Sequence, residues 1–414
     1  MSNRIAIRAA MCAAAIPVFA FLFFLCSPCR AEEKAPALKV AAFITAGDIQ
    51  HLLRTDEGRR QAVDILKGIG VKKVYLDTYR DGLISDTALL ASLRDYFKAA
   101  GFEVSGGITT TKGKDFGVGS PSHRYWLCYN YPETRNAIRG VMENAAKIFD
   151  EIIVDDFFAT DCRCPECDAL RNGRDWGQFF RDNLVEVSRD DVVGAAKKVN
   201  PKINVIIKYP QWYDRFHVMG YDTARQPGIF DMVWVGTETR DPKKENVQQY
   251  EAFVNYTWLK SAGGGKTHGG WFDWINCYPA VYMEQAYQTV LAGAEEMVLF
   301  GYSPEQFETD NLREFTARLP QLEKMYLALR PMRHDGIFAY KPPNSDPGAD
   351  TYIFDFMGML GLPLVMAAQF PADARAAFLS EHALADPDIA AKTLAFLKKG
   401  GTVVATAGFL AGLK

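Results

Sequence analysis

Eight short β-rich segments alternate with amphipathic helical segments between residues 38 and 329. An alternation of this kind predicts a parallel sheet. Eight such units over roughly 290 residues match the number and size of a (β/α)8 TIM barrel. We therefore predict an α/β protein in which residues 36–330 form a (β/α)8 barrel catalytic domain. The predicted strands are 38–44, 73–78, 103–109, 151–157, 204–209, 232–237, 270–275 and 296–302.

An open, doubly wound sheet is the alternative for the same alternation. It would place a glycine-rich phosphate loop after an early strand. Residues 45–50 are Thr-Ala-Gly-Asp-Ile-Gln, which is not a G-x-G-x-x-G loop. The sequence therefore favours the barrel. The predicted helices are 56–69, 86–100, 132–149, 176–199, 246–260, 282–292 and 305–329.

A second, smaller domain is predicted over residues 336–414. A proline-rich connection at 341–348 precedes a helical segment and three short β-rich segments near 362–366, 376–380 and 402–406. So few strands suggest a small open α/β domain that is incomplete or is completed by a partner. An unpaired sheet edge favours pairing with another chain, so a homo-oligomer through this domain is expected.

The first 31 residues have the pattern of a secretory signal peptide. Arg4 and Arg8 precede an apolar run over 9–26, and Cys29 and Ala31 are small residues at the −3 and −1 positions of a cleavage site. We predict cleavage after Ala31 and an exported protein, periplasmic or extracellular, with no membrane association after cleavage. An uncleaved membrane anchor is the alternative, because the run is near spanning length.

The charge balance argues against a nucleic-acid partner. The 47 basic and 50 acidic side chains give a formal net charge of −3. Nucleic-acid binding usually needs a basic face. We expect no such partner.

Carboxylates recur where the predicted strands end, which is where TIM barrels place reacting groups. Asp155 and Asp156 lie at the end of the fourth predicted strand, Asp273 lies near the end of the seventh, and Glu238 directly follows the sixth. Glycosidic hydrolysis needs two carboxylates, one to protonate the leaving oxygen and one to attack the anomeric carbon or activate water. Asp156 and Glu238 are the leading pair, followed by Asp273 and Asp155. Any one of these acids could instead cap a helix or bond a loop amide.

Aromatic and polar side chains near the same strand ends suggest a sugar ligand. Flat apolar rings can stack on sugar faces while charged groups bind hydroxyls. Tryptophans that simply pack helices on the barrel are the alternative. The predicted substrate-binding residues are Asp77, Tyr79, Trp126, Lys208, Tyr209, Trp212, Arg240 and Trp274.

Four cysteines have the spacing of a metal site. Cys162, Cys164 and Cys167 form a C-x-C-x2-C motif after the fourth strand, and Cys128 lies in the preceding rim loop. Four thiolates can close a tetrahedral shell around structural Zn2+. A disulfide to Cys128 or free thiols remain open alternatives. Cys277 is expected to be a lone buried thiol, and catalysis is expected to need no cofactor.

The stretch around Cys128 resembles a known family. Residues 128–135 are Cys-Tyr-Asn-Tyr-Pro-Glu-Thr-Arg, which is similar to the C-x-N-x-P-x-x-R stretch of family 42 glycoside hydrolases, the microbial β-galactosidases. The resemblance implies a barrel, zinc bound by Cys128, Cys162, Cys164 and Cys167, and a glutamine-amidotransferase-like domain after the barrel that often serves trimer formation.

The active-site positions depart from that family. It ends its fourth strand with Asn-Glu, where this sequence has Asp155-Asp156, and it has a nucleophilic Glu where Asp273 stands here. Barrels similar to α-galactosidases use an Asp at strand four as nucleophile and an acid after strand six, which Asp156 and Glu238 match.

The sequence therefore predicts an exported, divergent glycoside hydrolase that acts on oligo- or polysaccharides, with its linkage left open. A non-catalytic carbohydrate-binding barrel is the alternative. An amidase activity of the second domain is disfavoured, because no cysteine follows Cys277 that could serve as a glutaminase nucleophile.

Overall fold

The computed structural model describes residues 37–245, 248–303 and 309–413. The predicted signal peptide and the first residues of two predicted helices, at 246 and 305, lie outside these ranges. Among the described helices, none combines the length with the apolar composition that a membrane-spanning segment requires.

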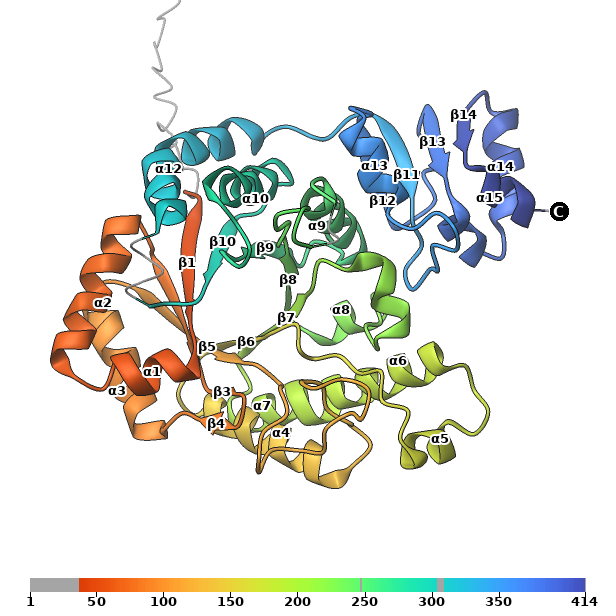
Figure 1. Cartoon of the computed structure of the whole chain (residues 1–414). Coiled ribbons are helices and arrows are strands. Elements are labelled where there is room, and N and C mark those ends of the chain that lie inside the picture. The colour runs from red at the N-terminus through yellow and green to blue at the C-terminus, as the bar shows by residue number, and fades with distance from the viewer. Residues whose placement is uncertain (1–36, 246–247, 304–308, 414) are drawn as a thin grey trace, which may run out of the picture. The chain divides into compact units, whose positions relative to one another are not determined.

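Eight parallel strands close into a barrel in which each strand pairs with its neighbour in the chain and the last pairs with the first. Figure 1 shows the strands at the centre and the helices around them. The predicted (β/α)8 fold is therefore confirmed. The barrel strands are β1 (Lys39–Ile44), β2 (Lys73–Asp77), β5 (Glu103–Ile108), β6 (Glu151–Val154), β7 (Asn204–Tyr209), β8 (Met232–Gly236), β9 (Thr267–Phe272) and β10 (Glu296–Phe300).

The outer helices start at recognisable signals. Thr45 and Thr55 accept backbone N–H groups as N-caps, and Pro132 and Pro279 occupy first turns. A short hairpin of β3 (Tyr79–Arg80) and β4 (Leu83–Ile84) follows β2. The helices are α1 (Ala46–Leu52), α2 (Asp56–Ile69), α3 (Thr87–Ala99), α4 (Pro132–Ala146), α5 (Pro165–Arg171), α6 (Trp176–Val187), α7 (Gly194–Val199), α8 (Gln226–Ile229), α9 (Glu251–Ala262), α10 (Pro279–Leu291) and α12 (Asp310–Leu329), with a 3-10 turn η2 (Tyr213–Val218).

The helix predicted as continuous over 176–199 is interrupted. A π-helical segment, η1 (Ser188–Val193), lies between α6 and α7. It contains the buried Asp191, which accepts hydrogen bonds from Arg135 and Arg139 of α4 at 2.6 Å each. π-helical segments occur mostly as single-turn insertions within α-helices, so the apolar spacing over 176–199 predicts one continuous helix.

The barrel interior is packed, and its base is closed by polar groups. Aromatic and aliphatic side chains from the strands, among them Phe43, Tyr75 and Trp271, fill the middle. Below them, at the amino ends of the strands, the Lys73 ammonium lies 2.6 Å from Glu151 and 3.1 Å from Glu296. This buried ion group closes the end of the barrel opposite the carboxyl ends of the strands.

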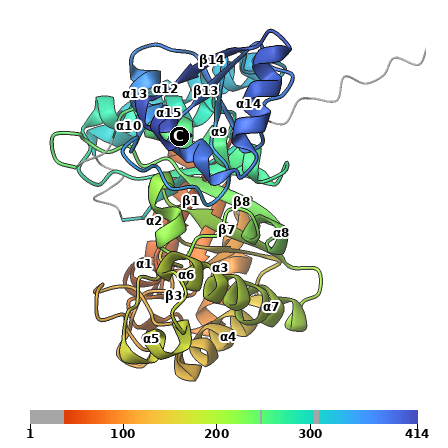
Figure 2. The ribbon, with the colours of Figure 1, turned by 90° about the vertical axis from the view of Figure 1, so that its right-hand side faces the viewer.

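The C-terminal domain is a four-stranded parallel sheet in the order β12-β11-β13-β14. Strand β11 is not among the predicted strands, because its four residues, directly before the Lys-Pro-Pro connection, are too few to show strand alternation. Figure 2 shows this domain beside α9. Its elements are β11 (Ile337–Tyr340), α13 (Ile353–Met359), β12 (Leu364–Ala367), β13 (Ala376–Leu379), η3 (Glu381–Ala385), α14 (Ile389–Lys398), β14 (Thr402–Ala405) and α15 (Ala407–Gly412).

Candidate active site and metal centre

A cavity of about 300 Å3 lies at the carboxyl ends of the barrel strands. Its walls combine charged groups with aromatic rings, as expected of a site that binds a polar ligand with apolar faces. The lining residues are Arg80, Asp155, Asp156, Phe157, Lys208, Gln211, Trp212, Glu238, Arg240, Trp271, Asp273, Ile275 and Phe300.

Lys208 is the central group of this cavity. Its side chain is 2 % exposed, and its ammonium hydrogen-bonds both Asp156 and Glu238, the latter at 2.6 Å. Asp155 lies 3.6 Å from the same nitrogen. Burial lowers the pKa of Lys208, but the three carboxylates around it raise it by more, so the ammonium stays charged.

Asp156 and Glu238 are held as acids with elevated pKa values. Burial raises the pKa of Asp156 to about 6 against the opposing charge of Lys208. Burial likewise raises the pKa of Glu238 to about 7. One oxygen of Glu238, Oε2, has no hydrogen-bond partner among the described residues. Perturbed acids in a cavity are typical of catalytic sites, although ionic networks can also produce them.

Asp155, by contrast, is fully engaged. It accepts hydrogen bonds from Arg80 at 2.8 Å and from the backbone N–H of Asp156 at 2.8 Å. Burial alone would raise its pKa, but the charges of Lys208 and Arg80 bring it below the ordinary value. Asp155 therefore orients Arg80 and the chain at Asp156 and is not a proton donor near neutrality.

Asp273 forms a bidentate ion pair with Arg240, at 3.0 and 2.6 Å. It also accepts the Ile275 backbone N–H at 3.0 Å. Arg240 in turn contacts Glu245 at 3.1 Å. With both oxygens bound to Arg240, Asp273 holds the arginine at the cavity wall.

Four aromatic rings line the cavity: Phe157, Trp212, Trp271 and Phe300. The Lys208 ammonium lies 4.8 Å from the centre of the Trp271 ring. Sequence reasoning singled out only Trp212 of these. Trp271 and Phe300 sit inside strands, and their inward direction follows from strand alternation once one inward residue is known.

Five predicted substrate-binding residues do not line the cavity. Tyr209 alternates with Lys208 and points out of the barrel, against Phe216 and Tyr221. The other four residues are likewise outside the cavity lining. Asp77 is buried beside Arg80, and burial raises its pKa to about 7. Tyr79 stacks on Phe116, Trp126 stacks on His123, and Trp274 flanks Asp273.

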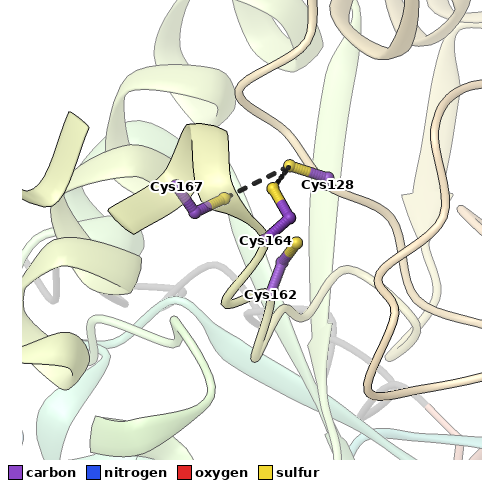
Figure 3. A group of neighbouring side chains, drawn as sticks. All are labelled: Cys128, Cys162, Cys164 and Cys167. Atoms are coloured by element: carbon purple, nitrogen blue, oxygen red, sulfur yellow. Dashed lines mark hydrogen bonds between the residues drawn. The ribbon is translucent and has the colours of Figure 1, made fainter. Parts of the chain in front are cut away.

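The four cysteines meet at one point on the barrel rim (Figure 3). The sulfur atoms of Cys128, Cys162, Cys164 and Cys167 all lie within 4.8 Å of one another, and all four are free thiols in the described chain. A Zn–S bond of about 2.3 Å places tetrahedral sulfurs roughly 3.8 Å apart. Cys128 Sγ lies 3.3 Å from Cys167 Sγ and 3.9 Å from Cys164 Sγ, so the four cysteines can bind a metal ion.

The surroundings of the cysteines fit such an ion. Asn130 Nδ2 donates a hydrogen bond to Cys167 Sγ at 3.1 Å, as expected beside a thiolate. The aromatic rings of Phe179 and Phe180 belong to the same buried cluster as Cys128, Cys162 and Cys167. Cys277, the remaining described cysteine, is half-buried and lies apart from the cluster.

The structure is a closed parallel barrel with acids, a buried lysine and aromatic rings at its mouth. Residues 28–320 match the family described as "probable glycosyl hydrolase, catalytic domain", and the chain belongs to that family. Residues 335–414 match the second domain of the protein SSO3021.

The full-length relative has no assigned activity. It is the uncharacterized protein SSO3021 of Saccharolobus solfataricus, 27 % identical over 367 residues, which are 79 % of this chain and 59 % of the relative. The chain thus spans about three fifths of the length of this curated relative.

Solved structures share the fold at low sequence identity. Alpha-L-fucosidase isoenzyme 2 from Paenibacillus thiaminolyticus aligns with a TM-score of 0.63 and 11 % identity, over 89 % of this chain and 64 % of the fucosidase. A GH5_18 protein from Streptomyces cattleya, in complex with Manb1-4GlcNAc, aligns with a TM-score of 0.55 and 13 % identity, over 90 % of this chain and 99 % of that protein. Similarity at this level demonstrates the fold alone.

Proposed function

We propose that this protein is an exported glycoside hydrolase that cleaves glycosidic bonds with Asp156 and Glu238. The observation that carries the proposal is the shared ammonium: both carboxylates bind Lys208 Nζ within a cavity walled by aromatic rings. Two acids, one cation between them and flat apolar surfaces supply what hydrolysis of a sugar acetal requires.

The pKa values suggest how the roles divide. Glu238, with a pKa raised to about 7, holds its proton near neutrality and can donate it to the glycosidic oxygen. Asp156, with a pKa of about 6, is the more ionised and can attack the anomeric carbon. Water then attacks the glycosyl-enzyme, with Glu238 acting as base. Lys208 stabilises the charge left on Glu238 after the first proton transfer.

The spacing of the two acids favours retention of configuration. Two oxygens that bind the same nitrogen lie within about 6 Å of each other, because each contact is about 3 Å or less. Retaining glycosidases hold their carboxyl groups about 5–5.5 Å apart, and inverting ones hold them further apart to admit water.

Zinc bound by Cys128, Cys162, Cys164 and Cys167 completes the proposal. The all-thiol donor set and the converging sulfurs favour Zn2+ over hard cations. The ion would connect the loops after β5 and β6 and serve structure, since it leaves no position for substrate. We also propose export to the periplasm or the outside of the cell and self-association through the C-terminal domain.

A substrate screen tests the activity. The mature chain is assayed on nitrophenyl glycosides of both anomers, including galactosides, fucosides and mannosides. We expect turnover on at least one substrate, and a fall of at least 100-fold in kcat for Asp156→Asn and for Glu238→Gln. Glu314→Gln, on the outer face of α12, is the matched control and should keep full activity.

Two results would count against the proposal. Full activity in both carboxylate variants would remove Asp156 and Glu238 from the reaction. Oligosaccharide binding without release of reducing ends, across a broad substrate panel, would favour a carbohydrate-binding barrel instead.

A further inference from the structure

A buried chain of hydrogen bonds joins the C-terminal domain to the barrel. The Lys341 ammonium lies 3.2 Å from Ser345 Oγ, and Ser345 Oγ lies 2.8 Å from His382 Nδ1. His382 Nε2 lies 2.9 Å from Asp214 Oδ1. With His382 neutral, each group donates to the next, so two neutral groups connect a cation to a carboxylate across the domain boundary.

This hydrogen-bonded network contains a serine, a histidine and an aspartate, but it is not placed to act as a hydrolytic triad. All four of its residues are at most 2 % exposed. None of them lines the cavity at the barrel mouth. Their buried position instead fits a rigid connection between the two domains, because satisfied polar networks in a low-dielectric interior are rigid. We refer to this connection, formed by Lys341, Ser345, His382 and Asp214, as the joint.

The barrel end of this joint lies directly behind the wall of the candidate active site. Asp214 is the second residue of η2, and Gln211 and Trp212, just before η2, line the cavity. The backbone N–H of Tyr352 donates to the second oxygen of Asp214 at 2.6 Å. The carboxylate is thus held by two groups of the C-terminal domain.

Further contacts hold the same loop from the same side. The Tyr213 hydroxyl donates to Asp355 Oδ1 at 2.9 Å. The backbone N–H of Thr223 donates to Asn344 Oδ1, also at 2.9 Å. The β7–α8 loop, residues 210–225, therefore has one face on the sugar cavity and the other anchored to the C-terminal domain.

We infer that the C-terminal domain is a positioning element for substrate binding, which acts through His382 and Asp214 to hold the loop that carries Trp212 at the sugar cavity. The inference rests on the proposed function for its kinetic readout. Trp212 would offer its ring to a sugar face, and its loop lacks regular helix or strand at residues 210–212. The anchor behind the loop would supply the rigidity that such a surface needs.

Kinetics and hydrogen exchange test this inference on the full chain. His382→Gln and Ser345→Ala should raise KM at least fivefold on the best substrate and leave kcat within about threefold, because the carboxylates are untouched. Amide hydrogen exchange should quicken in 210–225 and stay unchanged in the barrel strands. Lys392→Ala, which removes an ion pair with Asp386 inside the C-terminal domain, is the control and should change neither.

The two proposals fail in different ways. If the wild-type chain hydrolyses no glycoside, the proposed function is refuted. The hydrogen-exchange result alone then tests whether the C-terminal domain anchors residues 210–225. Unchanged exchange in 210–225 in folded Ser345→Ala, or a KM equal to that of the wild type, would overturn the positioning role. Ser345→Ala is the milder variant, and it keeps the test valid if His382→Gln does not fold.

Discussion

The ammonium nitrogen of Lys208 lies 2.6 Å from Glu238 Oε1, in a contact where the two side chains are 2 % and 3 % exposed. Asp156 binds the same ammonium. One positive charge is therefore shared by two carboxylates whose pKa values are elevated. One of the two acids is therefore favoured in its neutral form near neutrality, which is what an acid and nucleophile pair requires.

Replacing Lys208 by methionine should shift the pH dependence of hydrolysis. Without the cation, Asp156 and Glu238 lose the charge that favours ionisation, so both pKa values rise further. We expect the acidic limb of the kcat/KM profile to move up by at least one pH unit and the maximum to fall at least 100-fold. An unchanged profile in Lys208→Met would show that the ammonium does not set these pKa values.

The wild-type profile itself should be a narrow bell. Activity needs Asp156 ionised and Glu238 protonated, so kcat/KM should rise through about pH 6 and fall through about pH 7. Initial rates from pH 4.5 to 9 measure both limbs. Asp64→Asn, exposed on α2, should reproduce the bell. A plateau from pH 6 to 9 would contradict the role of Glu238 as the acid.

Removal of the metal should destabilise the barrel rim. We expect about one zinc ion per chain, and a lower Tm after treatment with a strong chelator, because the ion connects two loops. Cys162→Ser should lose the ion and show the same decrease in Tm, whereas Cys277→Ser should retain it. A zinc content well below one per chain, with Cys128 in a disulfide, would contradict the metal site.

The joint at His382 should weaken in acid. Burial lowers its pKa to about 4, and the charge of Lys341 adds to this, while Asp214 opposes it. The folded value lies below the unfolded value of about 6.5, so the stability from neutral His382 is present above pH 6.5 and is lost between pH 6.5 and 4. The groups that face it are Asp214, Lys341, His217 and Ser345.

Urea unfolding at pH 7.5 and at pH 5 measures this effect. Histidine titration should remove roughly 2 kcal/mol of the free energy of unfolding between these values. His382→Gln should be less stable than the wild type at pH 7.5 and should lose less stability on going to pH 5. Equal losses in the wild type and the variant would mean that His382 does not carry the acid sensitivity.

The barrel could be predicted because most of its strands contain a short β-rich run, and helical spacing follows them. The candidate acids followed from the rule that reacting groups lie at strand ends. Side-chain direction could not be predicted with the same certainty. Lys208 and Tyr209 are neighbours in one strand, and only the strand register shows that the first faces the cavity and the second faces the helices.

The joint between the domains could not be predicted from the sequence, for a different reason. Asp214 and His382 are 168 residues apart and belong to no local motif. The π-helical segment at 188–193 and the four-residue strand β11 were missed because neither changes the hydrophobic period over a long enough window.

Within the described residues, the ion group of Lys73, Glu151 and Glu296 closes the base of the barrel, so that the candidate site is reached from the carboxyl ends of the strands. If sugars are the substrates, each product must leave through the opening by which the next substrate arrives. A cleaved sugar and the next substrate would therefore occupy the same space at the carboxyl ends of the strands. We expect the released sugar to compete with substrate, which would be measured as product inhibition.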